Sequence, residues 1–487
     1  LLARTNNPMS EASVTHSTQE PTTGGKARSI AVLPFTLLAG HDSDTGEYEY
    51  LCLGLADALT NRLSNVRRFT VRPTSSVLPF QKSDTNPITA GQELDVEFVV
   101  SGILRVVGGK IRMTAQLLDV NEGSTKWAAS FSETFCDVLE LEDSLSEQVS
   151  KQLLPQLTGD ERRMLAKRGT NNVAAQEAYL QGRYFWSRFE PESFPKSIAA
   201  FNKAVELDPD FALAHVGIAD FNAWASIYGI VPPAAALPQT FASANRALEL
   251  DPSLAEAHAA LGLYYSNLQQ WSTAERSYRK SIELNPTYSL AHEWLSSVLV
   301  ATGQFQEGIK ELAIAEKLDP MSLRPKILSA WTMYQARSYD MALAKARELE
   351  GLDPNFMQSH LQTANILIEM GRKEEALIHS RRAVEAEPDS SLPIYVHCFA
   401  LAANDKRDEA IQVFEQWDER ASEMYVPPYF LGMACLAIGE RDKAFDYFNK
   451  AREEYSAWMI WSGTEPKLDP VRSDPRYKDL IEQMNGP

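Results

Sequence analysis

The sequence predicts a small α+β domain followed by an all-α superhelix of repeated helical hairpins. The first observation is a run of prolines spaced 34 residues apart, at Pro252, Pro286, Pro320, Pro354 and Pro388. A fixed period of this size is the signature of a solenoid, in which each unit buries its apolar face against its neighbours. The second observation is that short apolar runs typical of strands alternate with helical patterns before the repeats begin.

These patterns divide the chain into five parts. Residues 1–28 are rich in Ser, Thr, Asn, Pro and Gly and should form a disordered tether. The other predicted parts are an α+β domain at 29–157, a linker at 158–177, about eight repeats at 178–458 and a capping segment at 459–487.

The α+β domain should open with the apolar run Ile30–Phe35, which has the pattern of a buried strand. The further elements predicted from periodicity are a helix at 51–66, a strand at 69–71, a helix at 88–94, a hairpin of strands at 96–107 and 110–120, a strand at 125–133 and a helix at 138–157. This order favours one sheet with helices on one side.

The repeat from Ala255 to Tyr288 shows the repeat pattern in most detail. Its Leu-Gly pair, its aromatic and Ala positions and its final Pro resemble the tetratricopeptide repeat. Proline ends each second helix because it lacks an amide donor and disfavours helix in the residue before it. The repeats are predicted to begin near Ala178, Ala212, Ala255, Ser289, Leu323, Met357, Ser391 and Tyr425.

The earlier residues carry a second resemblance. The run Ser29–Phe35, the segment from Glu47 to Asn61, Val100-Ser101-Gly102 and Ala115 to Asp119 resemble the TolB-like amino-terminal domain of bacterial multidomain regulators. In that family the domain commonly precedes tetratricopeptide repeats. The resemblance also implies a separate output module in many members: a CadC-type winged-helix DNA-binding domain, an adenylate cyclase or a serine/threonine kinase. The sequence shows none of these modules.

Composition excludes several functions. The formal net charge is −18, and residues after 170 hold 30 Lys and Arg against 44 Asp and Glu. Phosphate neutralisation needs clustered basic residues, so we expect no direct nucleic-acid binding by this portion. The four cysteines share no short spacing, which argues against a disulfide framework or a paired-cysteine metal site.

No catalytic motif is present, and we expect a non-enzymatic protein without a cofactor or a metal. The suggestive residues are four histidines, His215, His258, His292 and His360, which all occupy the fourth position of a repeat. Adjacent repeats lie roughly 10 Å apart, so equivalent histidines are too distant to share one ion. We therefore interpret these histidines as packing residues.

Candidate partner-binding residues come from the tetratricopeptide resemblance, which implies that certain positions of each first helix face a concave groove. The candidates are Arg324, Trp331, Tyr334, Asn365, Tyr395 and Phe399. Tyr and Trp dominate interface energetics, and an Asn amide could hold an extended backbone. The alternative is that these aromatics pack between neighbouring helices.

Two functions fit the sequence. The first is a scaffold or sensory portion of a bacterial regulator that binds a protein or peptide in the groove. The second is the regulatory region of a signalling enzyme or a DNA-binding transcriptional regulator whose output module lies upstream of Leu1. The start Leu1-Leu2-Ala3-Arg4 suggests a membrane anchor upstream, which would place the chain on the periplasmic side; otherwise we expect a cytoplasmic protein.

Overall fold

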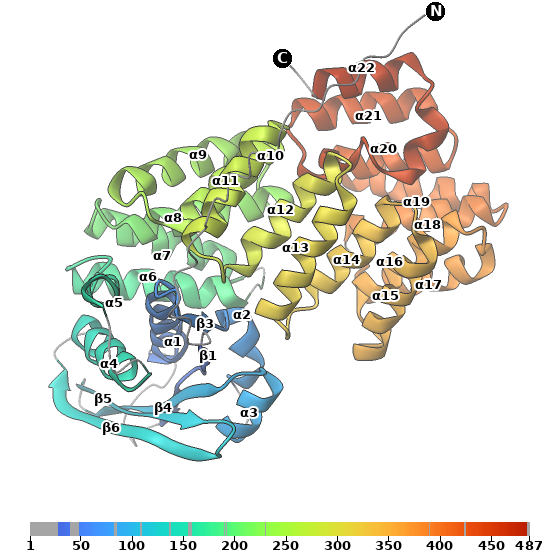
Figure 1. Ribbon diagram of the computed structural model, residues 1–487. Coiled ribbons are helices and arrows are strands. Elements are labelled where there is room, and N and C mark those ends of the chain that lie inside the picture. Colours follow the sequence, from blue (N-terminus) through green and yellow to red (C-terminus); the bar gives the residue numbers. More distant parts are fainter. Residues whose placement is uncertain are drawn as a thin grey trace, which may run out of the picture.

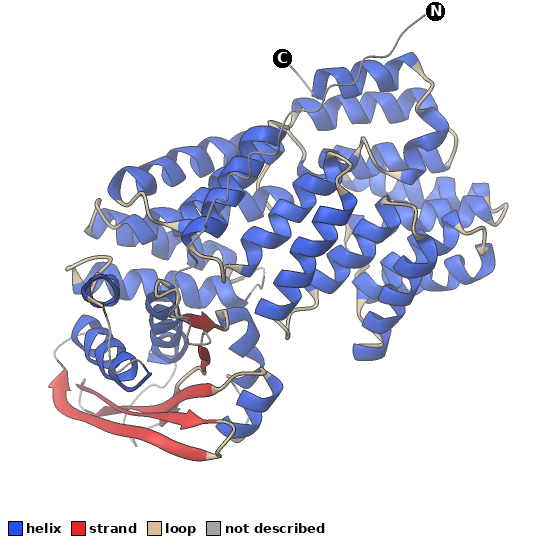
Figure 2. Cartoon of the chain, viewed as in Figure 1, coloured by secondary structure: helices blue, strands red, loops and turns tan. Residues whose placement is uncertain are grey.

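The computed structural model describes residues 28–484 except 39–47, 82–84, 108–109, 136–137, 154–157, 189, 191, 229, 389 and 423–424. The expected tether at 1–28 lies almost entirely outside the described residues. One sheet lies at one end of the molecule, and stacked helices make up the rest (Figures 1 and 2). The predicted fold class, an α+β domain followed by an all-α superhelix, is confirmed.

The sheet of the first domain has six strands. They are β1 (Arg28–Val32), β2 (Thr36–Leu38), β3 (Phe69–Val71), β4 (Phe98–Val107), β5 (Lys110–Asp119) and β6 (Ser124–Phe135). The strand order is β3-β1-β4-β5-β6, and β2 also pairs with β4. Pairings of β1 and β2 are parallel, whereas β4, β5 and β6 form an antiparallel meander.

Helices cover both faces of this sheet, which corrects the one-sided arrangement expected from the sequence. The helices of the domain are α1 (Glu49–Ser64), α2 (Thr74–Val77), η2 (Leu78–Phe80), α3 (Pro87–Glu93) and α4 (Val138–Leu153). Ile30 and Val32 belong to the core that α1 and α4 share, whereas Ala31 lies in a second core with Ala90 of α3. A continuous apolar strand is the pattern of a strand buried on both faces.

After the short helix α5 (Gly159–Leu165), eight helical hairpins follow in the described chain. The first helices are α6 (Val173–Arg188), α8 (Ala212–Ile227), α10 (Ala255–Asn267), α12 (Ser289–Ala301), α14 (Arg324–Gln335), α16 (Met357–Glu369), α18 (Ser391–Ala403) and α20 (Pro428–Ala437). The second helices are α7 (Phe194–Leu207), α9 (Pro233–Leu250), α11 (Trp271–Leu284), α13 (Phe305–Leu318), α15 (Tyr339–Leu352), α17 (Lys373–Ala386), α19 (Arg407–Arg420) and α21 (Arg441–Glu453).

Glycine lets the two helices of a hairpin approach closely. In the third hairpin, a Cβ added at Gly262 would lie 2.5 Å from the ring of Tyr278, which is fully buried. Gly182 and Gly432 meet phenylalanine rings in the same way at the two ends of the solenoid. The Leu-Gly and aromatic positions of the repeat thus pack against one another.

The chain ends with two short 3-10 helices, η3 (Ala457–Trp461) and η4 (Pro466–Val471), and the helix α22 (Pro475–Met484). Helix α22 packs on α21, next to the last hairpin (Figure 1). In contrast, η3 contacts α8, α10 and α12, which belong to much earlier hairpins. The terminal segment therefore does more than cap the stack.

Two sites with buried side chains fix the α+β domain to the solenoid, and the exposed Arg67 adds a hydrogen bond to the carbonyl oxygen of Glu283 near the end of α11. Helix α1 packs on α6, where Arg183 pairs with the buried Asp57 at 2.9 Å. At the end of α13, the Arg72 guanidinium donates to the carbonyl oxygens of Lys317 and Leu318, and Asp319 accepts from nearby serines. Within the described residues, no helix is long and apolar enough to span a membrane.

Candidate functional site

The concave side of the solenoid contains a cavity of about 540 Å³. Its walls come from the first helices α8 to α20 of seven successive hairpins, and η3 covers one side. We call this space the groove cavity. Its size falls within the range of ligand pockets, which are mostly apolar clefts with a few placed polar groups.

The structure brings four of the six predicted site residues to this cavity. Arg324, Trp331, Asn365 and Tyr395 line it. Tyr334 and Phe399 do not: they contact Lys467, whose ammonium lies 5.1 Å and 5.5 Å from the two ring centroids. Four of the six candidate positions therefore line the cavity, and Lys467 of the same chain covers the other two.

That cover is the segment of residues 456–472, which we call the C-terminal strap. The indole Nε1 of Trp458 donates to the carbonyl oxygen of Ile227 at 3.0 Å, across 231 residues of sequence. Trp461 meets the ring of Trp331 edge-on, with centroids 5.7 Å apart. The strap is thus an internal polypeptide ligand of the groove, anchored by two tryptophans.

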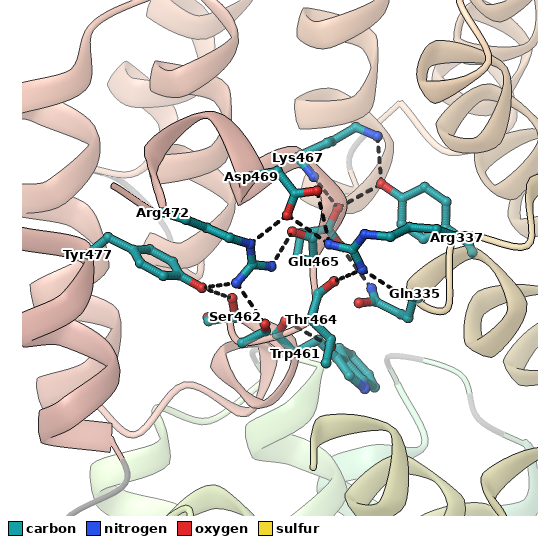
Figure 3. Close-up of polar contacts among 12 residues, drawn as sticks. Gln335, Arg337, Trp461, Ser462, Thr464, Glu465, Lys467, Asp469, Arg472 and Tyr477 are labelled. Atoms are coloured by element: carbon teal, nitrogen blue, oxygen red, sulfur yellow. Dashed lines mark hydrogen bonds and ion pairs between the residues drawn. The ribbon is translucent and has the colours of Figure 1, made fainter. Parts of the chain in front are cut away.

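Buried charges hold the strap on the middle repeats (Figure 3). The Glu465 carboxylate accepts from the Tyr334 hydroxyl at 2.7 Å and from the Gln335 amide at 2.9 Å. The Lys467 ammonium donates to the same hydroxyl at 2.9 Å and pairs with Glu369 at 3.2 Å. Breaking such a buried pair on one side costs about 3–5 kcal/mol, so this contact is a strong clamp.

A second polar contact lies beside this clamp. Arg337 binds both carboxylate oxygens of Asp469, at 2.7 Å and 3.0 Å, and donates to the carbonyl oxygen of Thr464. Arg472 donates to Asp469 as well and to the Tyr477 hydroxyl at 2.6 Å (Figure 3). Together these bonds position the strap relative to α14 and α22.

The cationic side chain in the cavity wall already has its partners. The Arg324 guanidinium lies 4.5 Å and 4.6 Å from the ring centroids of Trp224 and Trp294, and it pairs with Glu293. Burial raises the pKa of Glu293 and the Arg324 charge opposes that rise. Arg324 is therefore a structural cation held between two indoles rather than an anion receptor.

Several uncharged polar atoms of the cavity wall lack a hydrogen-bond partner in the described chain. They are Asn267 Oδ1, Trp331 Nε1, Gln362 Oε1, Trp461 Nε1 and both amide atoms of Asn365. Asn365 is only 1% exposed. A side-chain interaction between its amide and the Tyr395 hydroxyl opposes the burial-driven rise in the pKa of Tyr395, so the two groups face each other, although their geometry falls short of a hydrogen bond. Buried polar groups normally find partners in protein or ordered water, so these donors and acceptors mark where a neutral polar ligand would bind.

Sequence reasoning missed the strap, Gln362 and the two strap tryptophans. Gln362 lies at the sixth position of its repeat, outside the positions that the family resemblance assigns to the groove. The aromatic cluster Trp458-Met459-Ile460-Trp461 after the last repeat was the available signal, because such a segment has to be buried somewhere.

Comparisons with known proteins agree with this organisation. Residues 26–147 match the family described as HilA/YgeH-like transcriptional regulator, second domain. Residues 255–288 and 358–390 match tetratricopeptide repeat families. The chain therefore carries a HilA/YgeH-like regulator domain followed by tetratricopeptide repeats, although the match does not name TolB.

One curated relative is "Putative adenylate cyclase 3" of Rhizobium meliloti (strain 1021), with 26% identity over 202 residues. The match covers 40% of this chain and 34% of the relative, so the chain spans about a third of that protein's length. Among solved structures the chain is similar to YrrB, described as a TPR protein with an unusual peptide-binding site, at 21% identity and a TM-score of 0.29, covering 41% of this chain and 97% of that one. It is also similar to yeast Tom70, at 17% identity and a TM-score of 0.43, covering 72% and 79%.

Regulator-type and protein-interaction domains are thus combined in one chain.

Proposed function

We propose that this chain is a non-enzymatic sensory and scaffolding portion of a bacterial regulator, and that it binds a short, uncharged segment of a protein or peptide in the groove cavity. The observation that carries the proposal is the set of unpaired amide and indole groups around Asn365. A peptide unit offers one donor and one acceptor, which is the complement of the Asn365 amide.

The chemistry of the wall favours neutral, apolar segments. Trp331, Tyr395 and Phe430 line the cavity with aromatic surface, and the Arg324 charge is already paired. An anionic ligand group would lose its hydration without gaining a counter-charge, because Arg324 is the cationic side chain of the wall and is already paired with Glu293. The strap illustrates the mode of binding, because two indoles anchor it in the same groove.

A short path joins this cavity to the α+β domain. Arg324 begins α14, and Asp319, five residues earlier, accepts hydrogen bonds from Ser75 and Ser76 of the α+β domain. A ligand that shifts the start of α14 would act directly on this contact. This connection would allow the repeats to pass their state to an output module.

The test is a binding measurement with the full chain on an array of short peptides, followed by affinity measurements for the peptides that bind. We expect uncharged peptides with aromatic or large apolar side chains to be selected. Asn365→Leu, which removes the amide but keeps the volume, should weaken binding about tenfold or more, because two hydrogen bonds of about 1 kcal/mol each are lost.

Two further variants alter the cavity wall: Trp331→Phe and the double variant Trp331→Ala/Tyr395→Ala. The control is Tyr455→Ala. Trp331→Phe removes the indole donor and keeps the packing, whereas the double variant removes the aromatic wall. Tyr455 is exposed and lies outside the cavity, so Tyr455→Ala should bind as the unaltered chain does. Equal binding by all variants would place the peptide site elsewhere.

The second candidate is the regulatory region of a signalling enzyme or transcriptional regulator. It is supported by the match to a relative named as an adenylate cyclase and by the HilA/YgeH-like domain. Sequencing the gene upstream of the codon for Leu1 tests it. A cyclase, kinase or winged-helix signature in frame would support this candidate, and a start codon directly before Leu1 would contradict it.

A further inference from the structure

Three side chains outside the groove cavity point their ligand atoms at one common position. They are Glu350 of α15, His360 of α16 and His379 of α17. The two histidine Nδ1 atoms are 3.2 Å apart, and Glu350 Oε1 lies 3.4 Å from His360 Nδ1 and 3.0 Å from His379 Nδ1. Two nitrogen donors and one carboxylate oxygen thus form a nearly equilateral triangle.

Hydrogen bonds around the triangle orient its members. The Nε2 atom of His360 lies 2.9 Å from the carbonyl oxygen of Pro354. Because a carbonyl only accepts, this nitrogen carries the proton, and the lone pair of the neutral ring is on Nδ1, facing the triangle. Thr363 Oγ1 donates to Glu350 Oε1 at 2.9 Å. A histidine bonded to a carbonyl and a hydrogen-bonded carboxylate are the outer partners that metal ligands commonly have.

We infer that Glu350, His360 and His379 form a binding site for one divalent zinc ion. Tetrahedral zinc with bonds of about 2.0–2.1 Å holds its ligand atoms about 3.3 Å from one another, which matches the three separations. Two imidazoles and one carboxylate are a donor set that suits zinc. Glu350 and His379 are partly exposed, so water can take the fourth position.

At neutral pH, protonation of His379 does not compete with metal binding. Burial lowers the pKa of His379, and the neighbouring His360 and Arg382 lower it further, whereas Glu350 and Glu375 oppose them. The ring is therefore neutral at pH 7. A neutral His379 ring that carries its proton on Nε2 presents the Nδ1 lone pair to the ion, so zinc binding requires no loss of a proton from this ring.

The repeat before this one shows that the arrangement depends on residue type. The three equivalent positions there hold Glu316, Lys326 and Lys345. Lys345 pairs with Glu316 at 3.3 Å, and Lys326 donates to the carbonyl oxygen of Pro320. The equivalent backbone positions of this repeat therefore hold an ordinary ion pair. Histidine at both lysine positions turns that contact into a ligand set.

The sequence-based expectation of no metal site considered the cysteines and, among the histidines, only those at the fourth repeat position. His379 lies 19 residues after His360, on the second helix of the same repeat, and Glu350 comes from the preceding repeat. The bound ion would join α15 of one repeat to α16 and α17 of the next. It would therefore stabilise the stacking of these repeats.

The test is titration of the full chain with zinc chloride alone in a buffer that does not chelate metals, followed by calorimetry and by the thermal unfolding midpoint. We expect one high-affinity ion per chain and a midpoint that rises with zinc concentration. Cobalt in place of zinc should give the visible absorption bands of a four-coordinate site.

Two single variants remove one ligand each, His379→Gln and Glu350→Gln, and both positions are partly exposed, so the fold should persist. Each should weaken zinc binding about 100-fold and abolish the cobalt bands. The control is the double variant His215→Gln/His258→Gln, which removes two histidines outside the triangle and should bind as the unaltered chain does. The inference is overturned if the chain takes up no zinc at micromolar concentration, or if His379→Gln and Glu350→Gln bind it as tightly as the control.

Discussion

Replacing Asn365 with leucine should make the protein more stable and less able to bind. Asn365 is 1% exposed, and neither amide atom has a hydrogen-bond partner in the described chain. A buried polar group without a partner costs about 1–3 kcal/mol. Leucine has a similar size and shape, so the substitution removes this penalty without opening a cavity. We expect the free energy of unfolding to rise by about 1–3 kcal/mol.

The assay is urea unfolding of the full chain, followed by tryptophan fluorescence, at equal protein concentration for both proteins. Asn404→Leu is the matched control, because the Asn404 amide donates to the carbonyl oxygens of Lys373 and Ala400, both at 2.8 Å. That variant should lose about 1 kcal/mol. If Asn365→Leu instead destabilises the protein by as much as the control, the amide has a partner in the Tyr395 hydroxyl or in ordered water. The reasoning that the amide is kept for a ligand would then be wrong.

Three further perturbations test the packing. Burial raises the pKa of Glu142 to about 7, against the opposing charge of Arg62, so the folded state keeps a proton that the unfolded state releases from about pH 4.5 upward. Stability therefore falls as pH rises from about 5 to 7, and the unaltered chain should lose about 2–3 kcal/mol relative to Glu142→Gln between pH 5 and pH 8 in urea unfolding. Lys467→Ala removes the buried cation that pairs with the partly buried Glu369 carboxylate, which should cost about 3 kcal/mol and expose the strap to proteases. Gly262→Ala should cost about 1–3 kcal/mol in thermal unfolding because its Cβ meets a buried ring, whereas Gly351→Ala, with open space around it, should be neutral or gain up to about 1 kcal/mol.

For each of the three predictions, a different result would contradict the reasoning. A stability difference for Glu142→Gln that stays constant across the pH range would mean that the carboxyl is ionised throughout. Proteolysis of Lys467→Ala at the rate of the unaltered chain would show that the tryptophans alone hold the strap. A tolerated Gly262→Ala would mean that the hairpin can widen without cost.

The sequence predicted most of the fold because the relevant signals are local and periodic. The 34-residue spacing placed the first helices within a few residues, and β3 lies where the patterns predicted a strand. Four of the six candidate residues line the cavity because repeat position alone determines which side of a helix faces the groove. These features depend on neighbouring residues only.

What the sequence did not predict depends on contacts between distant residues. The bond from Trp458 to Ile227 spans 231 residues, and no periodicity encodes it. Tyr334 was predicted to face the groove, but it is fully buried and binds Glu465 of the strap, so it is unavailable to a partner. The second core under Ala31 is a similar case, because the continuous apolar run predicts a strand buried on both faces but not which element covers each face.

The strap changes the physical character of the solenoid. In a plain repeat array each unit contacts only its neighbours, so local opening at one end leaves the rest intact. Here η3 contacts the second, third and fourth hairpins, while Glu465 and Lys467 bind the fifth and sixth. The eighth hairpin is thereby tied to the second, and the groove cannot widen without breaking buried contacts. A ligand in the groove cavity touches the strap at Trp458 and Trp461 and the start of α14 at Arg324. It is therefore placed to act on the curvature of the repeats and, through Asp319, on the α+β domain at once.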